Sequence, residues 1–92
     1  VIKPAYEKLK KHNAKLVLVR MPTTGDYGAL DEKQFPREYY WDRIEEMTGV
    51  PTIYYEDIPF LASVDCPDGS HIDQSDTYAF TEQLFLAVKQ KL

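Results

Sequence analysis

Three stretches of the chain have the hydrophobic spacing of amphipathic helices, with apolar side chains three or four residues apart. They span residues 3–13, 37–50 and about 74–91. The last stretch is the clearest, because Phe80, Leu84 and Val88 fall on one helical face. Near the end of the second stretch, Gly49 is a typical helix stop. The pattern therefore predicts three helices.

Two short apolar segments lie between these helices. The run from Leu16 to Val19 is continuous rather than alternating, which is typical of a strand covered on both faces in a parallel sheet. A buried helix is the alternative, but the short, β-branched run favours a strand. A second β-rich segment, PTIYYED, covers residues 51–57. Strands that alternate with helices predict an α/β fold, with parallel strands joined by right-handed crossovers.

The length of 92 residues allows one small domain. A domain of this size buries only about 60% of the surface of its unfolded chain. A sheet of about two strands with three helices would leave its edges and apolar faces uncovered. We therefore expect residues 1–92 to form a single unit that either belongs to a larger domain or relies on a partner.

The composition is that of an ordinary globular chain, with 43% apolar and 28% charged residues. The formal net charge of −4 argues against a nucleic-acid partner, and we interpret the lysines near the start of the chain as a solvated helix face. Cys66 is the only cysteine, so there is neither a disulfide framework nor a cysteine pair for zinc. No apolar run approaches the roughly 20 residues of a membrane span, so we expect none in this chain.

Each predicted strand is followed by a long connection that reads as irregular, at residues 22–36 and 58–71. In open α/β sheets, ligands bind at the carboxyl ends of the strands. We therefore expect the two connections to lie at the same edge of the sheet and to carry any chemistry. Tyr27, in the first connection, is the most credible substrate contact, and Arg20 and Arg37 would suit an anionic substrate.

The second connection contains Asp68 and, three residues later, His71. A histidine that acts as a general base needs an acceptor on its second ring nitrogen, which fixes the tautomer and stabilises the imidazolium. An aspartate three residues earlier can turn back to make this contact. A structural role is the alternative, because Asp-Gly favours a turn and Asp73 or Ser75 can cap the following helix. Such a pair is half of a nucleophilic site, and the other half is a serine or cysteine.

The segment DGSHIDQSDTYAFTEQL, from Asp68 to Leu84, resembles the last sequence block of the SGNH, or GDSL-type, hydrolases and acyltransferases. The resemblance implies a flavodoxin-like fold, a three-layer parallel sheet of which this chain would supply about two strands and three helices. It implies that Asp68 and His71 are the aspartate and histidine of a catalytic triad. Many members have Pro-Asn after the histidine, where this chain has Ile72 and Asp73. An aliphatic residue there is similar to the envelope-associated acyl-modifying branch, which favours a cell-envelope or secreted location.

The nucleophile of that family lies in a Gly-Asp-Ser-like turn after its first strand, and this chain has no such turn. The three serines near His71 belong to the same connecting region and not to a strand-to-helix elbow; they are Ser63, Ser70 and Ser75. We therefore expect this chain to be the C-terminal half of a larger domain and to be inactive alone. The implied reaction is hydrolysis or transfer of an ester-linked acyl group, with a small-molecule or glycan ester as substrate. The alternative is a non-catalytic α/β binding or interaction module.

Other ligand chemistry is less well supported by the sequence. A cluster of oxygen and imidazole ligands suits a divalent ion but matches no defined metal-binding loop; it comprises Asp65, Asp68, His71 and Asp73. The TTGDYG segment lacks the lysine of a phosphate loop. We therefore expect no metal and no cofactor. Several aromatic residues could stack on a sugar, but we expect them in the interior; they are Tyr39, Tyr40, Trp41, Tyr54 and Tyr55.

Overall fold

The computed structural model describes all residues, 1–92, and contains five α-helices, a two-stranded sheet and three short 3₁₀ turns. The elements in chain order are α1 (Ile2–Lys11), β1 (Leu18–Arg20), α2 (Gly25–Gln34), α3 (Trp41–Thr48), β2 (Thr52–Tyr54), α4 (Pro59–Ser63) and α5 (Thr77–Lys91). The 3₁₀ turns are η1 (Arg37–Tyr39), η2 (Tyr55–Asp57) and η3 (Gln74–Asp76).

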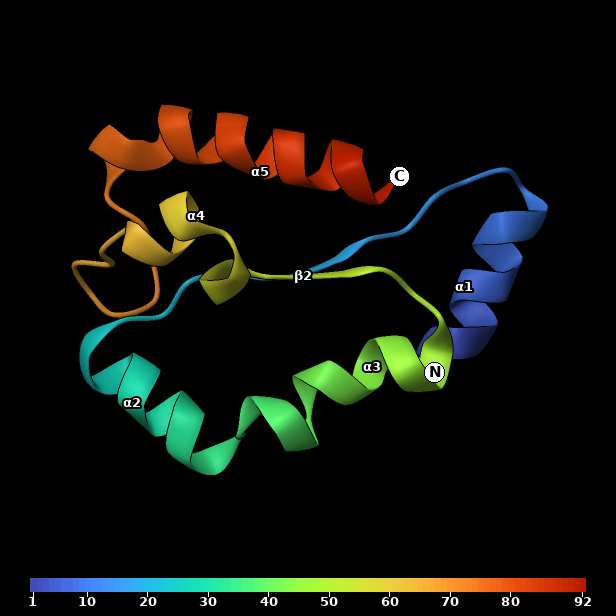
Figure 1. Cartoon of the computed structure of the whole chain (residues 1–92), viewed down its shortest axis with the longest axis horizontal. Helices are drawn as coiled ribbons and strands as arrows, with labels where there is room; N and C mark the ends of the chain where they lie inside the picture. The colour runs from blue at the N-terminus through green and yellow to red at the C-terminus, as the bar shows by residue number, and fades with distance from the viewer.

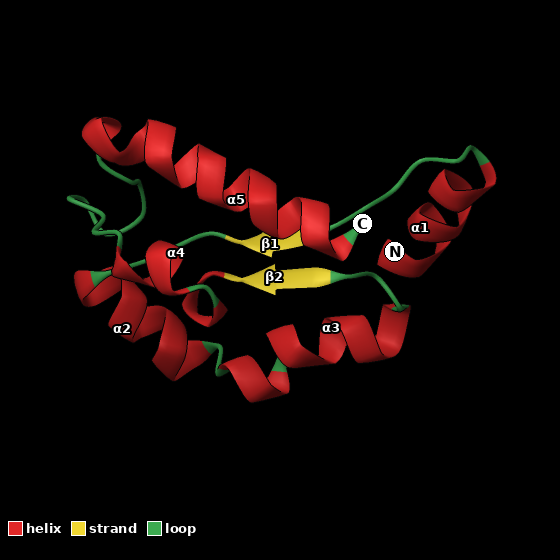
Figure 2. Cartoon of the chain, turned by 45° about the horizontal axis from the view of Figure 1, so that its top comes forward, coloured by secondary structure: helices red, strands yellow, loops and turns green.

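The two strands are parallel, with Val19 paired to Ile53 at the centre of the register. Their arrows point the same way in Figure 2. Helices lie on both sides of the sheet: α4 and α5 cover one face, and α2 and α3 lie beyond the other (Figures 1 and 2). α1 stands apart, past the amino ends of the strands (Figure 1). The predicted α/β class and parallel pairing are therefore confirmed.

The hydrophobic core lies under α4 and α5. Its buried members are Tyr55, Leu61, Val64 and Phe80, and Leu84 packs against them. Phe80 is 2% exposed, which makes it the principal contact of α5 with the rest of the molecule. The spacing that predicted this helix face is thus the spacing that builds the core.

Two helices occur where the sequence predicts irregular connections. α2 occupies much of residues 22–36, and α4 lies within residues 58–71. α2 has no apolar stripe and no buried residue, and it contains Gly28, a weak helix former. α4 is only five residues long, begins with Pro59 and is fixed by burial of Leu61. The three predicted helices occur as α1, α3 and α5, and the prediction missed α2 and α4 because neither segment shows a helical period.

The end of α3 agrees with the prediction from Gly49. This glycine adopts the left-handed conformation, with φ of 77°, and its N–H donates to the carbonyl of Glu45 at 2.8 Å. The chain then turns toward β2 through Val50, which is fully buried. The glycine therefore sets the direction in which the second strand enters the sheet.

The expectation of an aromatic interior was only partly correct. Tyr55 is buried, and Trp41 and Tyr54 are half-buried with their rings 6.0 Å apart. Tyr39 and Tyr40, however, are 68% and 54% exposed. The reason is that η1 and the start of α3 contact the sheet through Arg37 and Trp41, which pack against Tyr54, so the two rings between them face solvent.

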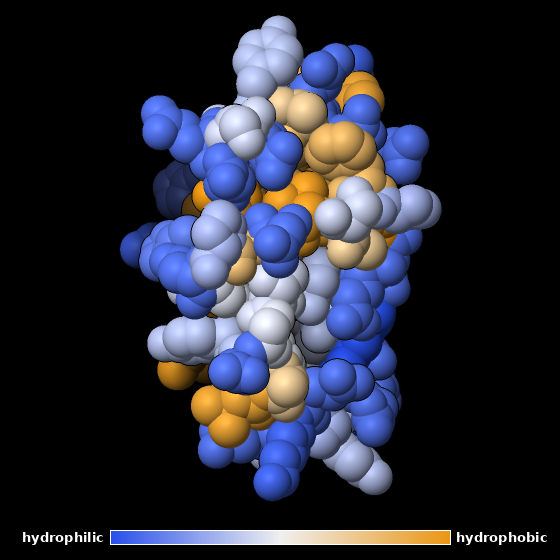
Figure 3. Space-filling model, turned by 90° about the vertical axis from the view of Figure 1, so that its left-hand side faces the viewer, coloured by the Kyte–Doolittle hydropathy of each residue, from blue (hydrophilic) through white to orange (hydrophobic).

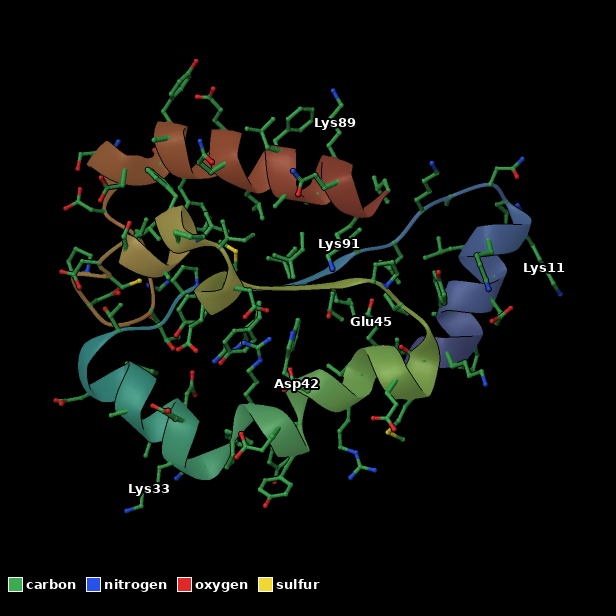
Figure 4. All side chains as sticks on the ribbon, viewed as in Figure 1. Lys11, Lys33, Asp42, Glu45, Lys89 and Lys91 are labelled. Atoms are coloured by element: carbon green, nitrogen blue, oxygen red, sulfur yellow. The ribbon has the colours of Figure 1, made fainter.

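The lysines of α1 lie on a solvated surface, as the sequence indicates. All of them are exposed, and Lys10 forms an ion pair with Glu7 at 3.3 Å. Side chains such as Lys11 and Lys33 point away from the body of the molecule (Figure 4). None of the helices has the length and apolar character that crossing a membrane requires.

Candidate active site

The two strand-end connections meet at the carboxyl edge of the sheet, and Thr24 joins them. Its N–H donates to the carbonyl of Gly69 at 3.0 Å, and its hydroxyl accepts from the N–H of Cys66 at 3.0 Å. The same hydroxyl lies 3.1 Å from the carbonyl of Cys66 and 3.2 Å from a carboxylate oxygen of Asp65. The expectation that both connections share one edge is therefore confirmed.

Gly69 allows the second connection to approach α2 closely. Its φ is +90°, and a Cβ there would lie 3.0 Å from Cβ of Tyr27 and 3.2 Å from the carbonyl oxygen of Thr24. A side chain would therefore be both strained and crowded at this position. The glycine therefore allows the loop that carries Asp68 and His71 to approach the start of α2.

Asp68 and His71 are in direct contact. Oδ2 of Asp68 lies 2.7 Å from Nδ1 of His71. The other oxygen, Oδ1, accepts from the N–H of Ser70 at 3.0 Å and from the N–H of His71 at 2.8 Å. The aspartate thus folds the chain back on itself, which is why a separation of three residues suffices for side-chain contact.

These contacts keep Asp68 ionised. The N–H of Ser70, the His71 ring and the N–H of His71 lower the pKa of the carboxyl to about 2. An ionised carboxylate only accepts hydrogen bonds, so Nδ1 of a neutral His71 must carry the proton. Nε2 is then the basic nitrogen, and it makes no hydrogen bond within the chain. Because the His71 side chain is 82% exposed, Nε2 is open to a group brought from outside.

No serine of this chain is placed to use that nitrogen. The Oγ of Ser70 lies 3.1 Å from Nδ1, the nitrogen that already faces Asp68. Ser63 donates to the carbonyl of Phe60, and Ser75 donates to Asp73. The hydroxyls near the pair therefore serve local turns.

Asp73 has the capping role that the sequence allows as the structural alternative. One of its oxygens accepts from the N–H of Ser75 at 2.9 Å at the start of η3. No three acidic, histidine or cysteine side chains converge closely enough to hold a metal ion. Cys66 is buried, its Sγ lies 3.6 Å from the carbonyl of Pro22, and burial raises the pKa of its thiol. A reactive thiolate is disfavoured at this position.

Of the residues proposed to contact a substrate, Tyr27 is exposed beside the Asp68–His71 pair and Arg20 is engaged in an ion pair. Tyr27 is exposed, but it belongs to the first turn of α2 and not to an irregular loop, and it packs against Gly69 beside the Asp68–His71 pair. Arg20 is engaged in an ion pair with Asp31. The structure therefore brings Tyr27 next to the pair, whereas the charge of Arg20 is compensated within the chain.

Arg37 is also engaged internally. Its guanidinium makes two bonds to Asp57, at 2.7 and 2.6 Å, and one to Asp42 at 2.8 Å. It also stacks on the ring of Tyr54, 4.2 Å from the ring centre. The bond to Asp57 is the main reason that the pKa of Arg37 is raised. Arg37 thus ties η1 to β2 and η2, which argues against a role as an anion receptor.

A groove of about 1180 Å³ lies between the sheet and the α2–α3 side of the molecule. Thr23 and Gly28 line it near the strand ends, and Trp41 and Tyr54 line it farther along. The indole N–H of Trp41 is buried without an acceptor. Neither this groove nor the role of Thr24 was predicted, because both arise from contacts between segments far apart in the sequence.

The surface on which both strands end has intermediate hydropathy across its middle, with apolar patches above and below and hydrophilic residues along the sides (Figure 3). Asp68 and His71 belong to the exposed loop on this side of the molecule. The chain matches no protein-family model, no curated protein and no solved structure. The resemblance to the SGNH hydrolases therefore stays a prediction based on the segment around Asp68 and His71.

Proposed function

We propose that this chain supplies the aspartate and histidine of a serine-dependent esterase or acyltransferase that acts on ester-linked acyl groups. The observation that carries the proposal is the 2.7 Å contact between Asp68 Oδ2 and His71 Nδ1, with Nε2 left free. A general base of a catalytic triad requires this arrangement, in which one nitrogen is held by a carboxylate and the other faces the nucleophile.

The mechanism follows from the two nitrogens of His71. Nε2 takes the proton of a serine hydroxyl as the serine oxygen forms a bond to the acyl carbon. When the tetrahedral intermediate collapses, the bond to the leaving oxygen breaks and Nε2–H delivers its proton to that oxygen. Water or an acceptor hydroxyl then repeats these steps on the acyl-serine, and the serine regains its proton. Asp68 orients the ring and stabilises the imidazolium in each half-reaction.

The wider context of the proposal rests on the resemblance described above. The chain would be the C-terminal half of a flavodoxin-like domain, and the remainder of that domain would supply the serine. The substrate would be a small-molecule or glycan ester, with acetyl as the acyl group, and the location would be the cell envelope or the exterior. The exposed Tyr27, which packs against the glycine beside Asp68, is the residue best placed to contact such a substrate.

The test measures hydrolysis of p-nitrophenyl acetate by the complete gene product that contains residues 1–92. We expect His71→Ala to lower kcat/KM by a factor of about 10³ or more. His12 is the only other histidine and is exposed at the end of α1, so His12→Ala is the matched control and should leave turnover unchanged. The 92-residue chain alone should show no turnover. Equal activity of the two variants, or His71-dependent turnover by the chain alone, would contradict the proposal and favour the non-catalytic module.

A further inference from the structure

α5 has large apolar residues on its solvent side as well as on its core side. Phe80 and Leu84 lie on the side that packs on the core. Tyr78, Phe85 and Leu92 lie on the solvent side, where they are 83%, 63% and 55% exposed. A surface helix of a globular protein normally has one apolar stripe, whereas a helix that is apolar all round is normally buried. The second stripe of α5 is therefore a candidate contact surface.

The residues of this outer stripe repeat every seven positions. Tyr78, Phe85 and Leu92 are seven residues apart, and so are Glu82 and Lys89 beside them. Seven residues are close to two helical turns, so each set forms a row along the helix. Glu82 and Lys89 are exposed and make no ion pair within the chain, and Lys89 points away from the sheet in Figure 4. The outer stripe thus combines an apolar row with a row of two unpaired, opposite charges.

The apolar row is complementary to itself when two copies of α5 run antiparallel. A two-fold axis between residues 85 and 86 places Phe85 opposite Leu86 of the second copy. The same axis places Tyr78 opposite Leu92 of the second copy. Leu86 is 47% exposed, so this register covers the four exposed large apolar residues of α5 in pairs.

The charged row matches in the same register. Glu82 lies opposite Lys89 of the second copy, and the symmetry of the contact forms this pair twice. Parallel helices would instead place Glu82 level with Glu82. A hollow of about 490 Å³ lies on this face, and Tyr78, Glu82 and Phe85 are among the residues that line it. The aliphatic part of Lys89 from the second copy can cover the two rings while its ammonium group reaches Glu82.

We propose that α5 is a dimerisation helix, whose outer stripe packs antiparallel on the outer stripe of a second copy of this chain. The 15 residues of α5 span about 22 Å. One pair of helices of this length offers less than the roughly 800 Å² that each partner buries in an interface of standard size. We therefore expect a weak dimer, with a Kd between about 10 µM and 1 mM. The inference does not depend on the proposed function, because no residue of the outer stripe belongs to the candidate active site.

The test is sedimentation equilibrium of the complete gene product that contains residues 1–92, at concentrations from about 10 µM to 1 mM. We expect a monomer–dimer equilibrium in this range. Phe85→Asp puts a charge at the centre of the contact and should leave the protein monomeric throughout. Leu30→Asp, at a position of α2 that is 50% exposed, is the matched control and should leave the Kd unchanged. Circular dichroism confirms that both variants are folded.

Charge reversal tests the antiparallel register. Glu82→Lys and Lys89→Glu each place like charges opposite one another twice, so each should weaken the dimer by a factor of about ten or more. The double variant places opposite charges together again and should restore the Kd of the unaltered protein. Glu46→Lys, at an exposed position of α3, changes the net charge as Glu82→Lys does and should leave the Kd unchanged.

Three results would overturn the inference. The first is a protein that stays monomeric up to about 1 mM, which would mean that no second copy covers the outer stripe. The second is a dimer that Phe85→Asp leaves intact, which would place the contact elsewhere. The third is a double charge reversal that dimerises no better than the single reversals, which would exclude the antiparallel register.

Discussion

At the scale of single residues, the carboxylate of Asp68 organises the candidate site and should make it sensitive to acid. Its pKa is lowered to about 2, so its stabilising contacts are complete above the ordinary value of 3.8 and are lost as the pH falls through about 2. We expect the amide NMR signals of Ser70 and His71 to titrate with a midpoint near 2. A midpoint near 3.8 would mean that the two N–H groups do not bind this carboxylate in solution.

Thr24 should hold the loop of the pair in place. In Thr24→Val, the N–H of Cys66 loses its acceptor, and we expect a loss of about 1–3 kcal/mol in the free energy of unfolding. Hydrogen exchange of residues 65–70 should become faster. Thr24→Ser keeps the hydroxyl and should behave like the unaltered chain. If Thr24→Val and Thr24→Ser lower the free energy of unfolding equally, the hydroxyl of Thr24 does not stabilise this loop.

Gly69 offers a test of the close approach to α2. Both Gly69 and Gly25 have positive φ, but only at Gly69 would a Cβ meet other atoms. We expect Gly25→Ala to cost about 1–2 kcal/mol, from backbone strain alone. Gly69→Ala should cost more, since crowding against Tyr27 adds to the strain. Thermal unfolding of the two variants compares them directly, and equal melting temperatures would contradict the packing described for Tyr27.

At the scale of elements, α5 packs on the hydrophobic core through one face, and its other faces are exposed to solvent. Phe80 is 2% exposed and Phe85, on the same helix, is 63% exposed. We expect Phe80→Ala to lower the free energy of unfolding by about 3–5 kcal/mol and Phe85→Ala to change it by less than about 0.5 kcal/mol. Urea unfolding measures both. A large loss from Phe85→Ala in the isolated chain would mean that α5 packs with a different face.

The elements also show what the sequence can and cannot predict. α5, α3 and the two strands follow from periodicity, apolar runs and a helix-ending glycine. α5 and β2 bury the apolar side that their pattern indicates, at Phe80 and Ile53, whereas α3 and β1 have no fully buried residue. α2 has no buried side and α4 has only five residues, so neither shows a helical period. For the site, the three-residue separation of Asp68 and His71 predicted their contact. The hydrogen bonds between Thr24 and Cys66 join residues about 40 positions apart, which no local sequence pattern reveals.

At the scale of the whole molecule, the two-stranded sheet leaves the apolar run Leu16–Val19 only half-buried. The proposed role of His71 requires a serine near its Nε2, and no serine of this chain lies there. Under the proposed function, activity should therefore depend on a serine outside residues 1–92.

Fluorophosphonate labelling of the complete gene product tests the central claim most directly, because the probe reacts only with a serine that a base has activated. We expect one serine outside residues 1–92 to be labelled. Labelling should be lost in His71→Ala and kept in His12→Ala. Labelling that survives in His71→Ala, or a labelled serine within residues 1–92, would contradict the account.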